Sequence, residues 1–509
     1  MTSAIATKFD NLEFIKVIES FNPNGGINIG TLFHHAKETG VWIDPKTATQ
    51  AATNDDTKDI RNGRLFAEEN RGQLLFIAET SDVLKFGAEG WVRGSAVEAE
   101  RAAKAVIASM RIEACELFKI AHDDPKAKEL NKHADYSSTA QRIQAMIDLA
   151  KSEEGMSERI SAFDADPNLL GVRNGVLNLK TKALMQVIPD LRVSMRANIL
   201  FDQDANCPTW IQFIEDIQPD PDIQRMLQQL AGIFLCGDSN LQKLIFLYGG
   251  GANGKSTFIE LIAWLLGDYT KRIATEMLMQ HQRSPQGPSP DIISLKGRRL
   301  VYCNEVEEGR HLAEARVKEL TGGDTLSGRV PYAKEDISFQ PSHKLVMVGN
   351  HQPEIHDMSH GMWRRMLLIP FDVIVPDNKR DPYLLEKLKC EGSGILNWAL
   401  VGYHNYLKNG LQVPNVISDA TNAYKDEQDL IGEWINDHCK TVVGVLTPKG
   451  DVYRAYHYWA RKRGQFPLAQ GRFIKRLSDK GYKLDAGRRN VTGIELNTEG
   501  RQASISFIN

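Results

Sequence analysis

The sequence predicts a multidomain protein of the mixed α/β class, and three observations lead to this fold. At 509 residues the chain is too long for one hydrophobic core and should hold roughly three domains. Short apolar runs bounded by glycine alternate with stretches of helical periodicity, so strands and helices share the chain. Residues 244–266, LIFLYGGGANGKSTFIELIAWLL, combine an apolar strand, a glycine-rich loop and an apolar helix in one unit.

The chain is predicted to divide into four segments. Residues 1–60 form an N-terminal segment that ends in a polar linker rich in Thr, Asp and Asn. Residues 61–205 are expected to form a mixed α/β domain, with strands at LLFIAE and DVLKFGAEGWVRG, a long helix from SAVEAERAAK onward, and a second hairpin at VRNGVLNLKTKAL. Residues 206–410 contain the glycine-rich loop, and residues 411–509 form a C-terminal domain whose two strands lie around KLDAGRRN and GIELN.

Composition excludes several classes of protein. The 62 Lys and Arg nearly balance the 65 Asp and Glu, so net charge alone indicates no nucleic-acid partner. The six cysteines are scattered singly, which disfavours a zinc ribbon and a disulfide framework. No apolar run approaches the ~20 residues of a membrane span, and the N-terminus lacks the features of a signal peptide. We therefore expect a soluble cytoplasmic protein with reduced thiols and no membrane partner.

The glycine-rich loop has the spacing G-x-x-x-x-G-K-S of a phosphate-binding loop. Its backbone N–H groups and the following helix N-terminus provide many donors for a triphosphate. Lys255 should reach the β- and γ-phosphates and should face solvent without them, whereas the Ser256 hydroxyl should join the ligands of Mg²⁺. ATP and Mg²⁺ are the expected cofactors. The binding residues are Gly249, Gly250, Gly251, Ala252, Asn253, Gly254, Lys255, Ser256 and Thr257.

Two further strands supply candidate catalytic residues. The strand at 300–303 is followed by Asn304 and Glu305, and Glu305 is the predicted catalytic carboxylate and second Mg²⁺ ligand. Glu307 is a weaker substitute, and a solvated acidic loop is the alternative. The strand KLVMVGN ends at Asn350, whose amide is a candidate sensor of the γ-phosphate.

Two adjacent arginines, Arg364 and Arg365, follow in HGMWRRMLLIPF. A fixed guanidinium suits the transition-state charge on a γ-phosphate, and in ring-shaped ATPases the neighbouring subunit provides it. Either arginine is therefore a candidate catalytic finger. The alternative is an ion pair within the subunit.

These segments in this order resemble the superfamily III helicases, specifically the helicase portion of the phage, plasmid and poxvirus primase-helicases. The resemblance covers roughly residues 70 to 500 and is carried by GGGANGKST, RRLVYCNEVEEG, VKELTGGDTLSGR, KLVMVGNHQP and WRRMLLIPF. It implies an AAA+-like ATPase core, a homo-hexamer with ATP sites between subunits, and 3′ to 5′ translocation along single-stranded DNA. In the family, the segment here written GRVPYAKEDISFQP forms a hairpin that grips DNA, which implies DNA contacts for Tyr332 and Lys334.

The sequence departs from this family at two places. Asn304 stands where many relatives carry an acid, which weakens the division of roles between it and Glu305. The residues before the region of resemblance are too few for a primase, so we expect a separate primase or polymerase as a partner. The host implied by the family is a bacterial cell.

The C-terminal domain carries a local excess of positive charge, with thirteen basic residues against three acids between positions 440 and 490. This domain resembles the winged helix that ends many primase-helicases, with QGRFIKRLSDKGY as recognition helix and DAGRRNV as wing. A solvated charged face is the alternative interpretation. The candidate DNA-binding residues are Arg472, Lys475, Arg476, Arg488 and Arg489.

Three functions remain open from the sequence. The first is a replicative DNA helicase of a phage, plasmid or other mobile element. The second is an initiator that binds origin duplex DNA and melts or remodels it. The third is an unrelated phosphate-loop kinase, which would have no use for the basic C-terminal region.

Overall fold

The computed structural model describes residues 57–507 except 81, 281–289, 305–308 and 330–335. These residues form two units. One unit holds the chain up to Arg71 together with Ala96–Ser157, and the other holds Gly72–Ser95 together with the chain from Glu158 onward. Among the described residues, none of the helices combines the length and apolar character that crossing a membrane requires. The predicted domain boundaries at 60, 205 and 410 stay predictions.

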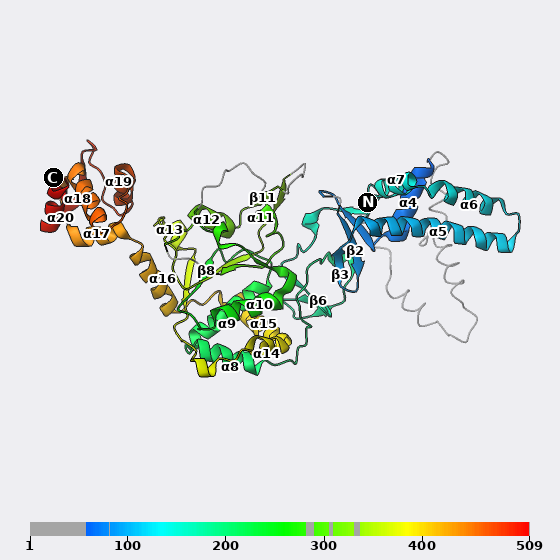
Figure 1. Cartoon of the computed structure of the whole chain (residues 1–509), viewed down its shortest axis with the longest axis horizontal. Coiled ribbons are helices and arrows are strands. Elements are labelled where there is room, and N and C mark those ends of the chain that lie inside the picture. The colour runs from blue at the N-terminus through cyan, green and yellow to red at the C-terminus, as the bar shows by residue number, and fades with distance from the viewer. Residues whose placement is uncertain (1–56, 81, 281–289, 305–308, 330–335, 508–509) are drawn as a thin grey trace, which may run out of the picture. The chain divides into compact units, whose positions relative to one another are not determined.

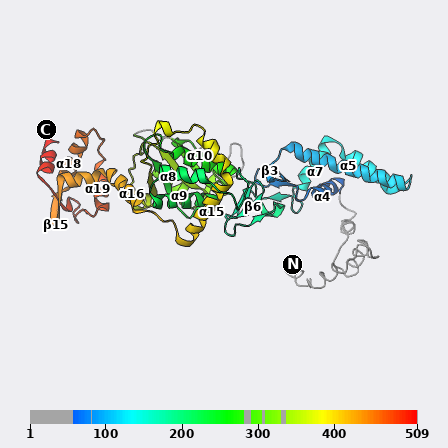
Figure 2. The same ribbon diagram turned by 90° about the horizontal axis from the view of Figure 1, so that it is seen from below.

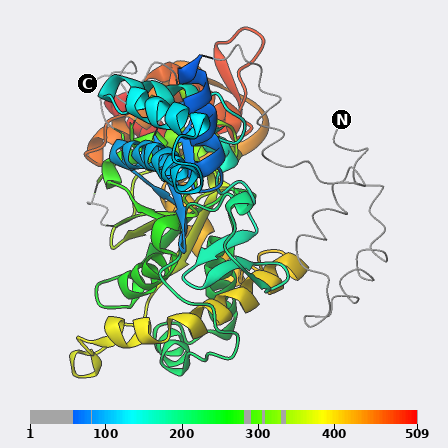
Figure 3. The same cartoon turned by 90° about the vertical axis from the view of Figure 1, so that its right-hand side faces the viewer.

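The first unit is helical. Its helices are α4 (Lys58–Asn70), α5 (Ala96–Ile120), α6 (Pro125–Ser137) and α7 (Ala140–Ala150), seen in blue and cyan in Figure 3. The predicted long helix is α5, which buries one apolar stripe that includes Ala103, Val106 and Met110. Between the helices, Asn62 is buried, and its Nδ2 atom donates to Ser137 Oγ at 2.9 Å.

The second unit begins with two small antiparallel sheets, both predicted from the sequence. The first pairs β1 (Leu74–Ile77), β2 (Val83–Gly87) and β3 (Gly90–Arg93), and β4 (Ser157–Glu158) follows α7. The second has the order β5 (Leu169–Val172), β6 (Gly175–Asn178), β7 (Leu184–Met185). The chain then enters the central sheet through α8 (Pro208–Ile217) and α9 (Pro221–Leu235).

A five-stranded sheet with the order β14-β8-β13-β10-β9 forms the centre of the second unit. All of its neighbouring strands pair in parallel. The strands are β8 (Leu244–Tyr248), β9 (Thr270–Arg272), β10 (Leu300–Asn304), β13 (Lys344–Gly349) and β14 (Met366–Pro370). Both faces of β8 are buried, which explains why its sequence is a continuous apolar run without polar alternation.

Helices cover both faces of this sheet, and successive residues of β8 point into two different cores. Ile245 and Leu247 belong to a core shared with α8, α9, α10 (Lys255–Leu266), α14 (Leu384–Cys390) and α15 (Gly392–Asn409). Leu244 and Phe246 belong to the opposite core, shared with α11 (Pro290–Ile293), α12 (Glu314–Thr321), α13 (His360–Trp363) and α16 (Asn415–Glu427). Figures 1 and 2 show α8, α9, α10 and α15 gathered on one face.

The C-terminal part of the second unit has its own core. Its elements are α17 (Leu430–His438), β15 (Cys439–Pro448), α18 (Lys449–Lys462), α19 (Gln470–Asp479), β16 (Asn490–Leu496) and α20 (Thr498–Ser506). Trp434, Tyr456 and Phe473 pack against one another, with the Tyr456 and Phe473 rings stacked at 4.3 Å between centroids.

One predicted strand of this region was wrong. The partner of β16 is β15, whereas KLDAGRRN contributes only a bridge from Leu484 to Val491. β15 is rich in β-branched residues that suit a strand, while the Asp, Gly and Asn of the second segment suit a turn. The helix predicted at QGRFIKRLSDKGY is confirmed as α19, and its role in DNA recognition stays a prediction.

Close packing of α9 on α15 requires glycine at Gly402. A Cβ atom at this position would lie 2.0 Å from the Gln228 carbonyl oxygen, which belongs to the backbone of α9. We predict that Gly402→Ala lowers the free energy of unfolding by about 2 kcal/mol or more, because the two helices must separate. Chemical denaturation measures this change. The matched control is Gly471→Ala, where a Cβ would have nothing within 4 Å; an equal loss in both variants would contradict the prediction.

Candidate functional site

The glycine-rich loop connects the carboxyl end of β8 to the first residue of α10, Lys255. Gly249 and Gly254 have positive φ angles of 153° and 81°. A Cβ at Gly249 would lie 2.2 Å from the Phe371 carbonyl oxygen, and one at Gly254 would lie 2.6 Å from Ile217 Cγ2. Both positions therefore need glycine, for conformation and for space. Ala252 also has a positive φ, of 60°, so the loop is curled over most of its length.

The side chain of Lys255 is buried, which corrects the expectation that it faces solvent. It is 4% exposed. Its Nζ donates to the carbonyl oxygens of Gly249 at 2.8 Å and Gly250 at 3.0 Å, and to Asn253 Oδ1 at 2.7 Å. A buried ammonium needs such acceptors because it has lost its water, and here the curled loop supplies them. Burial lowers the pKa of Lys255 to about 8.

Asn253 links the loop to the neighbouring strand. Its side chain is 3% exposed, and its Nδ2 donates to the Phe371 carbonyl oxygen at 2.8 Å while its Oδ1 accepts from Lys255. The backbone N–H of Val375 donates to Ala252 O at 2.9 Å. The segment that follows β14 therefore helps to hold the loop in shape. Sequence reasoning missed this contribution because it depends on β14 lying beside β8.

A pocket of about 690 Å³ opens over the loop and joins three strand ends. Because β8, β13 and β10 are parallel and in register, their carboxyl ends lie at one edge of the sheet. The predicted residues that line the pocket are Gly251, Ala252, Asn253, Gly254, Lys255, Ser256, Thr257, Asn304 and Asn350. Gly249 and Gly250 are absent from this lining and act through their carbonyl oxygens, which accept from Lys255.

The donor set at the pocket fits a hard cation such as Mg²⁺. Asn304 is the last residue of β10, and its Oδ1 atom is buried with no hydrogen-bond partner in the described part of the chain. The Asn304 backbone oxygen accepts from Thr275 Oγ1 at 2.8 Å, which fixes the strand end. An amide oxygen and the Ser256 hydroxyl are the oxygen ligands, direct or through water, that Mg²⁺ takes. Glu305 and Glu307 lie outside the described residues, so their roles stay predictions.

Three pocket residues with polar or charged side chains were not singled out from the sequence: Glu260, Arg272 and His351. Glu260 lies on α10, and His351 follows Asn350. Arg272 is the last residue of β9, opposite Tyr302 in the register with β10. The order of the strands in the sheet brings Arg272 to the loop. The only signal in the sequence was its place at the end of a short strand.

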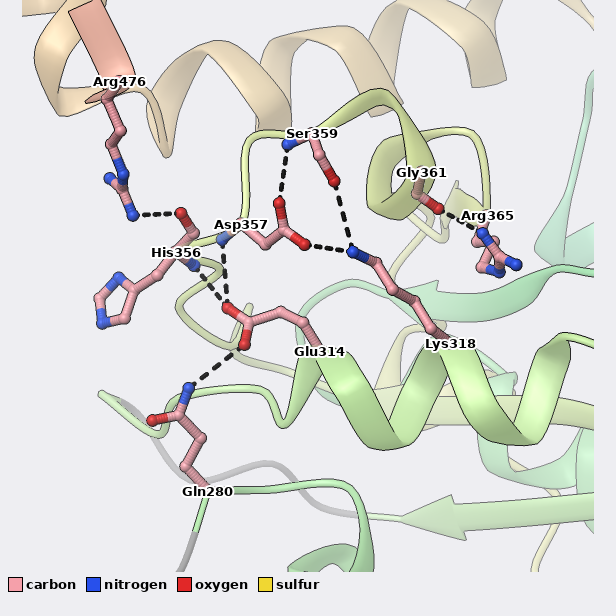
Figure 4. A network of polar contacts seen from close by, with 9 residues as sticks. All are labelled: Gln280, Glu314, Lys318, His356, Asp357, Ser359, Gly361, Arg365 and Arg476. Atoms are coloured by element: carbon pink, nitrogen blue, oxygen red, sulfur yellow. Dashed lines mark hydrogen bonds and ion pairs between the residues drawn. The ribbon is translucent and has the colours of Figure 1, made fainter. Parts of the chain in front are cut away.

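Arg364 and Arg365 lie outside this pocket. They precede β14, and the Arg365 carbonyl oxygen accepts from the backbone N–H of Leu244, the first residue of β8, at 2.7 Å. The arginines therefore lie at the amino ends of the strands, opposite the glycine-rich loop. Arg364 is exposed, whereas the Nη1 atom of Arg365 donates to Gly361 O at 2.6 Å (Figure 4). Burial, followed by the nearby Arg364 charge, lowers the pKa of Arg365.

The predicted DNA contacts are only partly described. Tyr332 and Lys334 lie outside the described residues, but the base of their hairpin is present. β11 (Leu326–Gly328) and β12 (Ile337–Phe339) pair antiparallel, and Arg329 Nε contacts Asp336 Oδ1 at 2.7 Å just beyond them. The sequence therefore correctly located a hairpin between α12 and β13.

The basic residues of the C-terminal part differ in their surroundings. Arg472 and Lys475 are exposed on α19, whose opposite side buries Phe473 and Leu477. Arg476 instead donates from Nη2 to the carbonyl oxygen of His356, which follows β13 (Figure 4). Arg488 and Arg489 are exposed in the turn before β16. Their role in DNA binding stays a prediction.

Burial of Lys255 makes stability depend on pH. Its pKa is about 8 when folded, against 10.5 for an ordinary lysine, so the unfolded chain binds more protons between these values. The free energy of unfolding therefore rises with pH across that window. We predict that the unfolding temperature of the native protein increases relative to that of Lys255→Met between pH 8 and pH 10.5. Calorimetry at the two pH values tests this, and a constant difference would contradict the burial of the charge.

Comparisons with known proteins agree with the resemblance seen in the sequence. Residues 63–219 match the family described as D5 N terminal like, and residues 247–365 match a family of unknown function. A protein of Acanthamoeba polyphaga mimivirus named "Putative helicase L207/L206" is 29% identical over 60% of this chain and 35% of its own length. "Putative primase C962R" of African swine fever virus is 28% identical over 41% of this chain and 22% of its own length.

The chain spans about a third or less of the length of these curated relatives. Among solved structures, the apo structure of the NrS-1 C terminal region is similar at 10% identity. The similarity covers 84% of this chain and 83% of the NrS-1 chain, with a TM-score of 0.46.

Proposed function

Because the chain is a relative of the D5-type viral helicases, we propose that it is an ATP-dependent DNA helicase of superfamily III. The observation that carries this proposal is the pocket in which the phosphate loop, Asn304 and Asn350 meet. A pocket made of backbone N–H groups, one lysine and polar strand ends suits a triphosphate better than an apolar metabolite. In this proposal, a phage, plasmid or related element encodes the protein, and the protein moves 3′ to 5′ along single-stranded DNA.

In the proposed ATPase reaction, phosphate oxygens replace the loop carbonyls and Asn253 as acceptors for Lys255. Mg²⁺ would neutralise charge on the phosphates, with Ser256 and Glu305 as its protein ligands and Asn304 beside them. Glu305 would orient and polarise the attacking water, and the Asn350 amide would contact the γ-phosphate. Arg272 adds a positive charge to the same pocket, where it would face the phosphates.

A homo-hexamer is part of the proposal because the two candidate finger arginines lie away from the pocket of their own chain. Arg364 and Arg365 lie at the amino ends of the strands, where they cannot reach a phosphate bound by the loop of the same chain. In a ring, the same arginines of a second copy could face the pocket. The proposed core is AAA+-like, with the DNA strand passing through the ring against Tyr332 and Lys334.

The second candidate, an initiator that binds origin duplex, is favoured by one observation. α19 carries Arg472 and Lys475 on its exposed side and buries its other side in the C-terminal core. We assign this part to a winged-helix-like fold, with α19 as recognition helix and Arg488 and Arg489 in the wing. Binding to one duplex sequence would support an initiator, whereas ATPase stimulation by any single strand supports the helicase.

Strand displacement from forked DNA tests the helicase proposal. The native protein with ATP and Mg²⁺ should displace a strand from a fork with a 3′ tail, and Lys255→Ala should lower ATP turnover by about 10²-fold or more. The matched control Lys408→Ala removes an exposed lysine at the end of α15 and should keep both activities. Unwinding only from a fork with a 5′ tail would overturn the proposed 3′ to 5′ direction of translocation. Full ATP turnover by a correctly folded Lys255→Ala protein would overturn the assignment of the loop.

Mixing two inactive variants tests the placement of the arginines. Arg364→Ala with Arg365→Ala removes the candidate finger, and Lys255→Ala removes the phosphate contact. If the finger acts on a neighbouring subunit, mixed rings contain some interfaces with both an intact loop and an intact arginine, so part of the ATPase activity should return. ATP turnover is measured across mixing ratios, with subunit exchange confirmed. No recovery at any ratio would contradict action between subunits.

A further inference from the structure

Three side chains with metal-binding chemistry lie together away from the nucleotide pocket: His311, Glu354 and His356. One candidate ligand atom of each residue lies within 4.8 Å of the other two. The rings of His311 and His356 are 4.5 Å apart between centroids, and His311 Nδ1 lies 3.2 Å from Glu354 Oε2. The proposed reactions of ATP and DNA use none of the three.

The backbone holds the two segments of this cluster side by side. His311 and Glu354 form a parallel β-bridge, in which the backbone N–H of Leu312 donates to Glu354 O at 2.9 Å. Glu354 N–H donates in turn to Arg310 O at 2.8 Å. The ligand side chains therefore start from fixed backbone positions. This preorganisation is what a metal site needs, because little chain entropy is lost when the ion binds.

One polar atom of the cluster has no hydrogen bond. His311 Nδ1 is buried, yet within the described residues no acceptor or donor meets it with hydrogen-bond geometry, despite the nearby Glu354 carboxylate. Buried imidazole nitrogens are normally paired, and His311 Nδ1 instead faces the Glu354 carboxylate at 3.2 Å without forming a hydrogen bond, so the two atoms are placed to share a bound cation. The side chains of His311 and Glu354 are 41% and 48% exposed, which leaves an ion access to the cluster and leaves the side chains room to adjust.

A second set of contacts fixes the backbone on the other side of His356. The Glu314 carboxylate accepts from the backbone N–H groups of His356 at 2.8 Å and Asp357 at 3.2 Å. Lys318 forms an ion pair with Asp357, and Arg476 donates to the His356 carbonyl oxygen. Figure 4 shows the His356 imidazole pointing away from this network, so the ring remains available as a ligand.

We propose that His311, Glu354 and His356 bind one transition-metal ion of the Zn²⁺ class. Two imidazole nitrogens and one carboxylate are a common protein donor set for Zn²⁺, with water as the fourth ligand. Tetrahedral Zn²⁺ with bonds of about 2.0–2.1 Å requires ligand atoms somewhat closer than 4.8 Å, which side-chain rotation of the exposed groups can provide. The Glu354 charge offsets the repulsion between the ion and Arg476. Nitrogen ligands discriminate against Mg²⁺, so the Mg²⁺ used with ATP would not compete.

Such an ion would connect two parts of the proposed ATPase core. In the sequence, Glu354 and His356 lie between Asn350, which lines the pocket over the loop, and Arg364, one of the two candidate fingers. Leu312 and Ala313 separate His311 from the first residue of α12, Glu314. A bound ion would fix the segment after Asn350 to the start of α12, as the contacts of Glu314 and Lys318 already do for the next residues. This role rests on the proposed function, but the binding of the ion does not.

Metal titration of the full chain tests the site. Protein stripped with a chelator is titrated with ZnCl₂ in buffer that contains millimolar Mg²⁺, and separately with Co²⁺, whose visible absorption reports nitrogen coordination. We expect one Zn²⁺ per chain, and a loss of affinity of more than about tenfold in His311→Ala, His356→Ala and Glu354→Gln. His122→Ala, an exposed histidine of the other unit, is the matched control and should bind Zn²⁺ as the native protein does.

Thermal unfolding without metal shows whether each variant is folded. If an alanine variant is unfolded, Glu354→Gln still tests the site because it keeps the shape of the side chain. Absence of Zn²⁺ binding by the native protein at micromolar concentration would overturn the site. Equal binding by folded His311→Ala and His122→Ala would overturn it as well. Because no nucleotide or DNA is present, failure of this test leaves the helicase proposal to be judged by strand displacement alone.

Discussion

The parallel register of β8, β13 and β10 is the constraint on which the candidate site depends. Asn304 pairs with Val348 on β13, and Gly349 pairs with Tyr248 on β8, so all three strands end at the same edge. Each chain segment that leaves this edge starts beside the others, which places the glycine-rich loop next to two polar strand ends. The same register sends residues that precede a strand to the opposite edge. If Arg364 or Arg365 is catalytic as proposed, the phosphate that it contacts would therefore be bound by another copy of the chain.

At that edge, the charge of Lys255 is matched by acceptors from the curled loop. A buried ammonium without acceptors is costly, and the loop meets this need by turning the carbonyl oxygens of Gly249 and Gly250 inward. Asn253 completes the set and is held by Phe371 in turn. A phosphate would be a stronger partner than these neutral oxygens, since both charges would then be paired. In the proposed function, phosphate binding would be an exchange of acceptors around Lys255, and the loop and the segment after β14 should respond together.

Local patterns predicted the parts of the site that lie within one stretch of sequence. The strand, loop and helix around Lys255 follow from glycine spacing and apolar periodicity, and Asn304 and Asn350 follow from their places at strand ends. Contacts that depend on strand order were missed, among them Arg272 in the pocket and Phe371 behind the loop. Burial of Lys255 was also missed, because the motif gives no sign of which acceptors the lysine uses before phosphate binds. In the C-terminal part, turn-forming residues were mistaken for a strand, and the contact of Arg476 with His356 had no signal in the sequence. Glu305, Tyr332 and Lys334 lie outside the described residues and stay predictions.

The exchange of acceptors around Lys255 is tested most directly by a structure of the protein with Mg²⁺ and a non-hydrolysable ATP analogue. We expect density for the β- and γ-phosphates in the pocket of about 690 Å³ over the loop. Lys255 Nζ should then contact phosphate oxygens and release Gly249 O, which it contacts at 2.8 Å in the structure described above. The exchange of acceptors would be contradicted by nucleotide bound elsewhere. It would also be contradicted by nucleotide bound in the pocket while Lys255 keeps its contacts to both loop carbonyls.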